Sequence, residues 1–159
     1  MFEGFKVVFV EDDATVRRSL TQSLELTGIE VVPCGSAEAV LPHIWSGMQG
    51  IVISDVQLPG MDGLQLLEHV CTVNPAIPVT LITAHGDVSM AVQAMRAGAY
   101  DFIEKPFSPE RFIETAQRAL EKRVLRMAVE DLRAQLQQKI GIEVALLGSS
   151  PAMVRVREQ

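Results

Sequence analysis

IVISDVQLPGMDG, residues 51–63, joins an apolar run to an acidic residue and then to a glycine-containing turn. The run Ile51–Ser54 is typical of a strand that is covered on both faces of a sheet. Four similar short runs occur elsewhere, at Val7–Val10, Ile29–Val32, Val79–Ile82 and, less apolar, Asp101–Ile103. The sequence therefore predicts five strands within its first 103 residues.

Helical patterns lie between these runs. Val16, Leu20 and Leu24 recur at four-residue spacing and predict the first helix. A second helix is expected from Ser36 to about Met48, with a kink at Pro42. Three more are expected near residues 64–71, near residues 87–95 and from residue 108 onward. The alternation predicts an α/β fold, a doubly wound five-stranded parallel sheet with helices on both faces.

Composition narrows the class of protein. Hydrophobic residues make up 48% of the 159 residues and charged residues 21%, which are ordinary values for a globular chain. No apolar run approaches the roughly 18 residues of a membrane span, and the first residues do not resemble a secretory signal. Cys34 and Cys71 belong to no metal-binding or redox spacing. We therefore expect a cytoplasmic protein with two free thiols and no membrane partner.

Charge is distributed unevenly along the chain. Residues 1–107 hold thirteen acids and five bases, whereas residues 108–159 hold seven acids and nine bases. The acidic front part argues against binding of nucleic acid by the folded domain itself. The concentration of carboxylates also suggests a cation site.

Polar side chains follow four of the five predicted strands. Residues 11–13 (Glu-Asp-Asp) follow the first strand, Asp55 ends the third, Thr83 ends the fourth and Lys105 follows the fifth. Carboxyl ends of parallel strands meet at one edge of a sheet, where ligands bind. One such aspartate would most simply be a turn former or a helix cap. Polar groups from four strands favour a functional site.

The residue types indicate a chemistry. Several carboxylates close together repel one another unless a cation joins them, and oxygen ligands suit Mg²⁺. One carboxylate oxygen would then remain free as a nucleophile. Thr83 can donate a hydrogen bond, and Lys105 can offset negative charge. Together these groups would favour phosphoryl transfer, in which positioning and electrostatics dominate.

The motifs VEDD, DVQLPGMDG, TAHGD and YDFIEKPF, at these separations, resemble the receiver domain of two-component response regulators, whose fold is flavodoxin/CheY-like. The resemblance covers residues 5 to about 120. It implies that Asp55 accepts a phosphoryl group from the phosphohistidine of a sensor histidine kinase. It also implies that Asp13, Asp55 and the backbone carbonyl of Gln57 bind Mg²⁺, with Asp12 acting close by through water.

The same resemblance assigns the remaining site residues. Thr83 would bond a phosphoryl oxygen, and Lys105 would pair with the phosphoryl group or with Asp55. The Lys105–Pro106 bond resembles the family's cis peptide. Phe102 occupies the aromatic switch position, where many receivers carry tyrosine, so contacts that need a hydroxyl cannot occur. The protein would catalyse only its own phosphorylation and dephosphorylation, and it would not be a conventional enzyme.

The final third of the chain carries a second pattern. An apolar 4-3-4 spacing predicts a helical coiled-coil linker over residues 121–140 that forms a homodimer, through Leu125, Val129, Leu132 and Leu136. The alternative is a single amphipathic helix that lies on its own domain, because the seam is only about two heptads long. Gly141 is expected to end the helix.

Residues 143–158, EVALLGSSPAMVRVRE, resemble the opening of the AAA+ ATPase module of sigma-54-dependent activators of the NtrC and DctD type. The resemblance implies that residues 141–159 begin such a domain in a longer regulator. No GxxxxGK[ST] motif occurs, so this segment cannot cradle a nucleotide phosphate. Contacts with sigma-54 RNA polymerase and DNA would be made by domains absent from this chain.

Two other functions are compatible with part of this pattern. A Mg²⁺-dependent phosphohydrolase of the haloacid dehalogenase type also uses an aspartate after a strand, but it needs a second acid two residues later, where this chain has Gln57. A dimerisation module that has lost phosphorylation is the other alternative. The complete set of Asp12, Asp13, Asp55, Thr83 and Lys105 argues against it.

Overall fold

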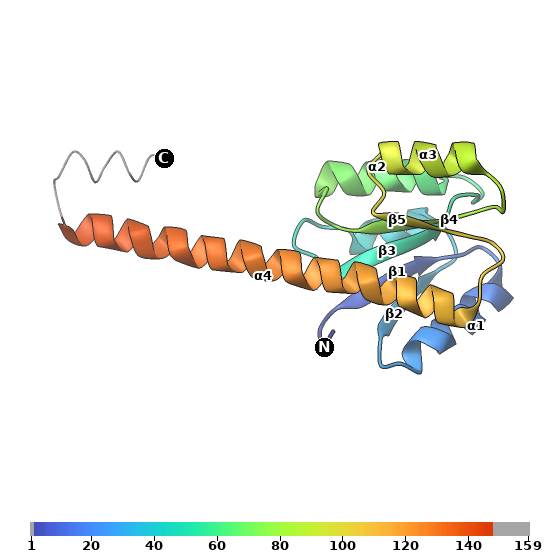
Figure 1. Cartoon of the computed structure of the whole chain (residues 1–159), viewed down its shortest axis with the longest axis horizontal. Coiled ribbons are helices and arrows are strands. Elements are labelled where there is room, and N and C mark those ends of the chain that lie inside the picture. Colours follow the sequence, from blue (N-terminus) through green and yellow to red (C-terminus); the bar gives the residue numbers. More distant parts are fainter. Residues whose placement is uncertain (1, 148–159) are drawn as a thin grey trace. The chain divides into compact units, whose positions relative to one another are not determined.

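The computed structural model describes residues 2–147. Figure 1 shows a central parallel sheet of five strands, β1 (Lys6–Val10), β2 (Glu30–Cys34), β3 (Gly50–Asp55), β4 (Val79–Thr83) and β5 (Asp101–Glu104). Their order in the sheet is β2-β1-β3-β4-β5, and every neighbouring pair is parallel. The chain reverses its direction of progress across the sheet between β1 and β3, which is where sheets of this kind bind ligands. The predicted fold class is confirmed.

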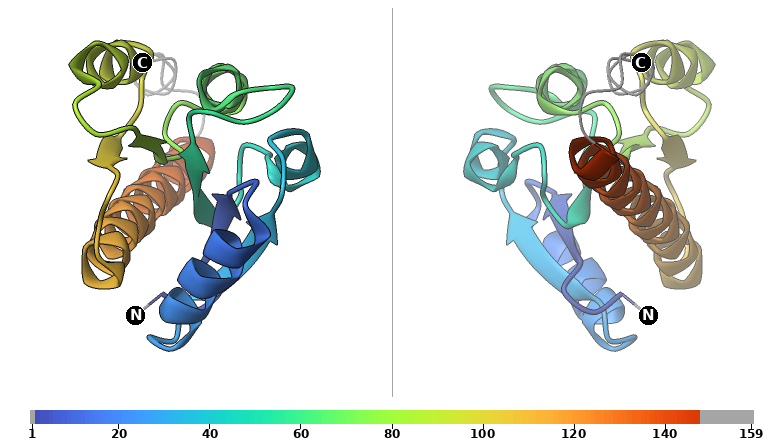
Figure 2. Two further views of the ribbon diagram at one scale, coloured as in Figure 1. Left: turned by 90° about the vertical axis from the view of Figure 1, so that its right-hand side faces the viewer. Right: turned by 90° about the vertical axis from the view of Figure 1, so that its left-hand side faces the viewer.

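Helices cover both faces of the sheet (Figure 2). The elements are α1 (Ala14–Glu25), the 3₁₀ helix η1 (Glu38–His43), α2 (Gly63–Val73), α3 (Val88–Arg96) and α4 (Pro109–Leu147). The helix α1 and the part of α4 up to Val124 pack on one face, and η1, α2 and α3 pack on the other. The sheet is therefore buried between two apolar layers, which explains why its strands read as nearly continuous hydrophobic runs.

The two layers use alternate residues of each strand. Val8 and Val10 of β1 point into the layer of α2 and α3, whereas Val7 and Phe9 point into the layer of α1 and α4. The Phe9 ring meets the Phe112 ring of α4 edge to face at 5.1 Å. This packing fixes the register of the strands, because a slip by one residue would exchange the two faces.

The second predicted helix is much shorter than expected. The structure has the six-residue 3₁₀ helix Glu38–His43 in place of a helix from Ser36 to about Met48. Pro42 lies inside η1, and proline removes a hydrogen-bond donor and clashes with the preceding turn of an α-helix. Residues 44–49 consequently form a loop that leads into β3.

The last helix is longer than expected. It begins as predicted directly after Ser108, whose Oγ accepts a hydrogen bond of 3.1 Å from the Arg111 amide. The prediction that Gly141 ends it is wrong, because α4 continues to Leu147. A glycine inside a helix costs only about 1 kcal/mol relative to alanine, and helix-forming residues flank this one on both sides.

The chain divides into two compact units, one up to Val124 and one that begins at Leu125. Residues 148–159, which include most of the expected start of an AAA+ domain, lie outside the described residues. Within residues 2–147, none of the helices combines the length and the apolar character that a membrane span needs.

Candidate functional site

Asp55 is the last residue of β3, and its side chain is held on both sides. It is 6% exposed. The backbone N–H of Gln57 donates to Asp55 Oδ1 at 3.0 Å, and the Nζ of Lys105 lies 2.5 Å from Asp55 Oδ2. Lys105 follows β5, so two distant strands bring this pair together as the sequence indicated. Among residues 2–147, Lys105 is the cation that pairs with this carboxylate.

Glu11 is a second buried acid, to which the sequence pattern assigned no individual role. It directly follows β1 and is 2% exposed. Its Oε1 lies 3.8 Å from Lys105 Nζ, and its Oε2 accepts a hydrogen bond of 3.2 Å from the Asp13 amide. Arg17 donates to the Glu11 backbone carbonyl at 2.6 Å. Glu11 therefore belongs to the same charged cluster as Asp55.

Asp13 has a different place from the one expected. Its Oδ1 accepts hydrogen bonds from the amides of Thr15 at 2.9 Å and Val16 at 3.2 Å, which makes it the N-cap of α1. A capping carboxylate satisfies amides that a helix start leaves without partners. Its exposure and these bonds direct Asp13 toward the helix. Glu11 and Asp12 are the better candidates for the acids beside Asp55.

The charges of this cluster act on one another. Burial raises the pKa of Glu11, and although the Asp13 amide and Lys105 lower it, the neighbouring Asp12 and Asp55 raise it further. Burial lowers the pKa of Lys105, but its hydrogen bond to Asp55 and the negative charges around it outweigh that effect and raise its pKa. Lys105 therefore remains charged at neutral pH, as a fixed cation among acids.

Thr83 ends β4 with a buried hydroxyl. It is 2% exposed, and among residues 2–147 its Oγ1 has no hydrogen-bond partner. A cavity of about 60 Å³ lies here, and Asp55, Thr83 and Lys105 all line it. A buried hydroxyl without a partner is energetically costly. The site therefore keeps a hydrogen-bond donor available beside the Asp55 carboxylate.

The turn after β3 depends on Gly63. A Cβ atom at this position would lie 2.4 Å from the Asp55 carbonyl oxygen, so no side chain fits. The Gly63 amide donates to the Val56 carbonyl at 2.9 Å. Asp62 and Gln65 form a reciprocal capping box at the start of α2, which makes Asp62 a helix cap. The capping box and the Gly63 hydrogen bond together stabilise the turn between Asp55 and α2.

The donor set fits Mg²⁺. Glu11, Asp12 and Asp55 provide carboxylates, and Gln57 provides a backbone carbonyl at the same edge. Among the described residues, no group of three His, Cys, Asp or Glu side chains is close enough to hold a metal ion by itself. Mg²⁺ does not need such a cage, because it usually binds one or two carboxylates and keeps several waters. The Oε1 of Glu11, buried without a hydrogen-bond partner in this part of the chain, is a suitable ligand atom.

Phe102 lies on β5, which is the edge strand next to β4. Leu81 of β4 pairs with Phe102, and Thr83 pairs with Glu104. The ring of Phe102 is half-buried and lines a groove of about 460 Å³ beside α3. The Lys105 amide donates to the Thr83 carbonyl at 2.9 Å, and the Lys105–Pro106 peptide bond is cis. Backbone hydrogen bonds thus connect Thr83 directly to the strand that carries Phe102.

Comparison with known proteins agrees with this arrangement. Residues 7–117 match the family described as the response regulator receiver domain. The match covers more than half of the chain. The protein therefore belongs to the receiver domains of two-component response regulators.

Particular relatives narrow the type of regulator. The C4-dicarboxylate transport transcriptional regulatory protein DctD of Rhizobium meliloti (strain 1021) is 42% identical over 152 residues, which cover 96% of this chain and 33% of that protein. The transcriptional regulatory protein FixJ of the same strain is 42% identical over 137 residues, 84% of this chain and 67% of that protein. The receiver domain of NtrX from Brucella abortus has a TM-score of 0.67 at 38% identity, over 73% of this chain and 98% of that structure.

These similarities confirm that the chain resembles receiver domains and regulators of the DctD type. The chain spans about a third of the length of the DctD relatives, which are transcriptional regulators.

Proposed function

We propose that this protein is a phosphorylation-dependent switch in which Asp55 accepts a phosphoryl group from the phosphohistidine of a sensor histidine kinase. One observation carries the proposal. The Asp55 carboxylate is buried between the Lys105 ammonium group and a cavity that also contains the partnerless Thr83 hydroxyl. A nucleophile, a cation and a hydrogen-bond donor are thus already positioned around a space that opens at the carboxylate.

The chain's own residues account for the transfer. A carboxylate oxygen of Asp55 forms a bond to phosphorus while the phosphorus–nitrogen bond to histidine breaks, and the electron pair of that bond stays on the imidazole, which is protonated as it leaves. Lys105 exchanges its contact with Asp55 for one with a phosphoryl oxygen. Thr83 donates its hydrogen bond to another phosphoryl oxygen. Both contacts stabilise charge that the carboxylate could not hold alone.

Glu11, Asp12, Asp55 and the Gln57 carbonyl would hold Mg²⁺ at this site. The ion would neutralise the negative charge between the acids and the incoming phosphoryl group. Asp13 would contribute indirectly, by capping α1 and by donating its amide to Glu11. The protein then acts as a phosphoacceptor that turns over only its own phosphoryl group.

The switch would run from Thr83 to Phe102. A bond from Thr83 to the phosphoryl group draws the loop after β4 inward and frees space for the Phe102 ring, so two packings of the groove beside α3 compete. On this account, Thr83→Ala still accepts the phosphoryl group but loses most of the conformational response. Hydrogen exchange of the α3 amides with and without a phosphodonor measures this. An unchanged response would exclude the route.

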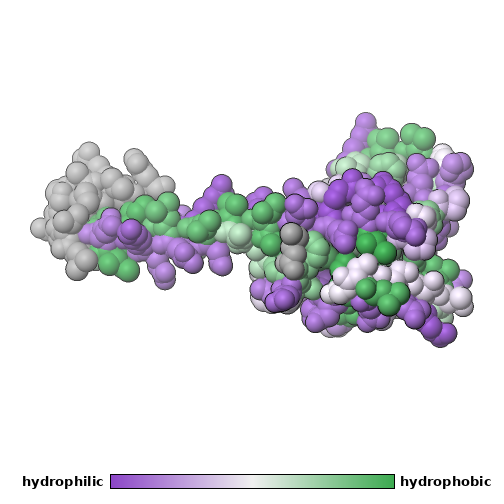
Figure 3. All heavy atoms as spheres, turned by 60° about the horizontal axis from the view of Figure 1, so that its bottom comes forward, coloured by the Kyte–Doolittle hydropathy of each residue, from purple (hydrophilic) through white to green (hydrophobic). Residues whose placement is uncertain are grey.

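The second unit supports a dimer. Figure 3 shows hydrophobic residues following one another along the part of α4 beyond Val124. Leu125, Val129, Leu132 and Leu136 are all exposed there. An exposed apolar stripe of this kind needs a partner, and a second copy of the same seam would supply it. We therefore assign residues 121–140 to a homodimeric linker.

The relatives suggest what the switch controls. The DctD proteins are transcriptional regulators about three times as long as this chain. We propose that phosphorylation of Asp55 alters the pairing of the linker and thereby controls a sigma-54-dependent activator. Contacts with RNA polymerase and DNA would belong to the rest of that protein.

Incubation with radiolabelled acetyl phosphate and Mg²⁺ tests the function. The proposal predicts a label that stays on the protein at a stoichiometry of one. Rapid release of inorganic phosphate over many turnovers would support a phosphohydrolase instead. Absence of both would support a dimerisation module without phosphorylation.

Sedimentation tests the linker. Leu132→Asp should convert the dimer to a monomer, because it places a charge in the seam. Ala134→Asp is the matched control, since Ala134 is exposed and lies two residues away, off the 4-3-4 pattern. The control should remain dimeric. A Leu132→Asp variant that stays dimeric would place the interface elsewhere.

A further inference from the structure

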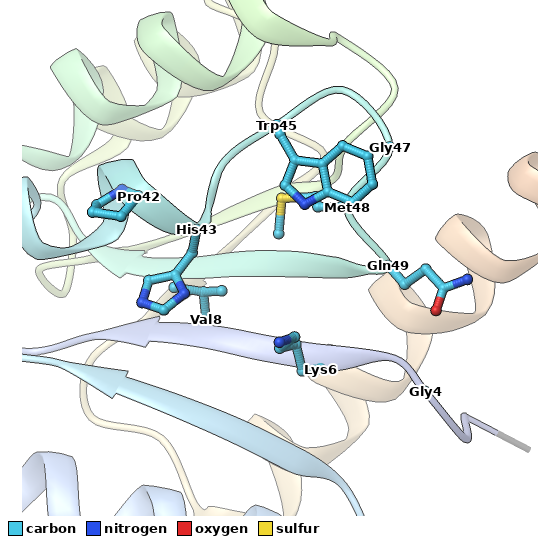
Figure 4. Close-up of a pocket in the computed structure, with 9 residues that line it drawn as sticks. All are labelled: Gly4, Lys6, Val8, Pro42, His43, Trp45, Gly47, Met48 and Gln49. Carbon is cyan, nitrogen blue, oxygen red and sulfur yellow. The ribbon is translucent and has the colours of Figure 1, made fainter.

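A second cavity lies at the amino-terminal half of β1, on the opposite end of the strand from the Asp55 site. Its volume is about 400 Å³, and all of its lining residues belong to the first unit. Figure 4 shows Lys6 and Val8 of β1 below it, His43 at the end of η1, and Trp45 and Gln49 of the loop that leads into β3. The cavity exists because η1 ends at His43 and leaves this loop in place of a longer helix. We refer to it as the Trp45 pocket.

Hydrogen bonds from two helices hold the backbone of the loop that carries Trp45. Arg123 of α4 is 1% exposed. Its guanidinium donates to the Met48 carbonyl at 2.9 and 3.2 Å and to the Ser46 carbonyl at 3.3 Å. Asn74, at the end of α2, also donates to the Ser46 carbonyl, at 2.7 Å. Two helices therefore fix the loop that carries Trp45, so binding there requires little ordering of the protein.

Trp45 presents an aromatic face to solvent. The side chain is 60% exposed, which is unusual for the largest apolar residue. Its ring lies against Gly47, where a Cβ atom would come within 2.4 Å of the ring. The glycine thus leaves room for one edge of the six-membered indole ring beside the loop backbone. The exposed indole offers a ring face on which a planar group can stack.

The pocket offers donors and no acid. None of its lining residues is Asp or Glu, although residues 1–107 carry eight more acids than bases. Lys6 takes part in none of the ion pairs between described residues. Glu30, its register neighbour on β2, is exposed and does not pair with it. The Lys6 ammonium group, the Trp45 indole N–H and the Gln49 amide can all donate to a ligand.

We propose that the Trp45 pocket binds a small planar anion, an aromatic ring that carries one carboxylate. The ring lies on the Trp45 indole, and the carboxylate lies at Lys6, where a charge-assisted hydrogen bond is available. A cavity of this volume falls within the range of small-molecule sites. The site is separate from Asp55 and does not depend on phosphorylation.

The single tryptophan of the chain provides the readout. In a ¹H–¹⁵N correlation spectrum of the whole chain, its indole N–H gives one cross-peak. Titration with 2-naphthoate should shift this cross-peak and the Lys6 amide saturably. The neutral isostere 2-naphthamide and inorganic phosphate each supply only half of the recognised chemistry, so each should bind at least about tenfold more weakly.

Variants separate charge at the pocket from charge in general. Lys6→Gln should weaken naphthoate binding by about tenfold or more. Arg18→Gln, which removes an equal charge from an exposed position on α1, should leave it unchanged. Glu30→Gln should tighten binding, because it removes the acid across from Lys6.

Three outcomes would overturn the proposal. Equal affinities for naphthoate and naphthamide would show that only the apolar ring is recognised. This comparison uses the parent protein alone and so does not depend on the folding of a variant. Equal losses in Lys6→Gln and Arg18→Gln would show a general charge effect. Shifts confined to the groove at Phe102, with an unmoved indole cross-peak, would place the ligand elsewhere.

Discussion

The two edges of the central sheet differ in how their buried charged groups are bonded. At the carboxyl edge, Glu11 Oε1 and Thr83 Oγ1 are buried with no hydrogen-bond partner among the described residues. At the amino edge, the buried guanidinium of Arg123 donates to two backbone carbonyls of the loop that enters β3. Folded proteins usually satisfy their buried polar groups. Thr21 Oγ1 and Thr80 Oγ1, away from the carboxyl edge, are buried without a partner among the described residues as well. The contrast therefore concerns the charged groups: Arg123 is bonded to the backbone, whereas Glu11 keeps an oxygen available for a ligand.

The largest change in stability should come from the amino edge. Arg123→Met should lower the free energy of unfolding by about 1–3 kcal/mol, because the Met48 carbonyl loses its donors. Arg126→Met is the control, since Arg126 makes only an exposed pair with Glu130 at 3.1 Å. Urea unfolding measures both. Similar losses of stability in the two variants would show that the buried hydrogen bonds of Arg123 matter no more than an exposed ion pair. Loss of Asp55 phosphorylation in Arg123→Met would show that the amino edge also affects the phosphorylation site.

A change of opposite sign is expected at Glu11. Because the folded state raises its pKa above the ordinary 4.5, the unfolded chain releases this proton first as the pH rises. In the absence of Mg²⁺, ionisation of Glu11 therefore reduces the free energy of unfolding as the pH rises above 4.5. Glu11→Gln should be more stable than the parent at pH 7, and the gain should disappear as the pH falls below 4.5.

Asp13→Asn is the matched control for this titration, because asparagine also caps helices. It should show no comparable gain at pH 7. Denaturant unfolding across the pH range with a chelator present measures the effect. If Asp13→Asn gained stability at pH 7 and Glu11→Gln did not, Asp13 and not Glu11 would be the acid that belongs to the charged cluster around Lys105.

The smallest change in stability should occur at Thr83. Thr83→Val replaces a hydroxyl that has no partner by a methyl group of similar size, so the free energy of unfolding should change by at most about 1 kcal/mol. The response of the α3 amides to a phosphodonor should nevertheless be lost. A large destabilisation, measured by urea unfolding, would mean that the Thr83 hydroxyl stabilises the unphosphorylated protein.

Much of the fold could be predicted because strand and helix patterns carry distinct periods. The five apolar runs gave the parallel sheet, and the sheet in turn placed Asp55, Thr83 and Lys105 at one edge. Helix ends were less predictable. Pro42 shortened one helix to a 3₁₀ turn, and Gly141 failed to end another because its neighbours favour a helix.

The choice among three consecutive acids was the main gap in the site. Residues 11–13 all follow β1, and only the geometry of the strand end decides which of them point inward. A local signal was available, since Asp13 directly precedes the helical stripe and Thr15 and Val16 provide the amides that an N-cap binds. The burial of Glu11 against Lys105, by contrast, arises from a contact between residues far apart in sequence.

Intact-mass spectrometry after incubation with acetyl phosphate and Mg²⁺ tests the central claim, that Asp55 is the phosphorylation site, most directly. The parent protein and Asp62→Asn, which alters the helix cap of the same loop, should each gain the mass of one phosphoryl group. Asp55→Asn should gain none, and a chelator should prevent the gain in the parent. An Asp55→Asn variant that is phosphorylated as fully as the parent would contradict the account.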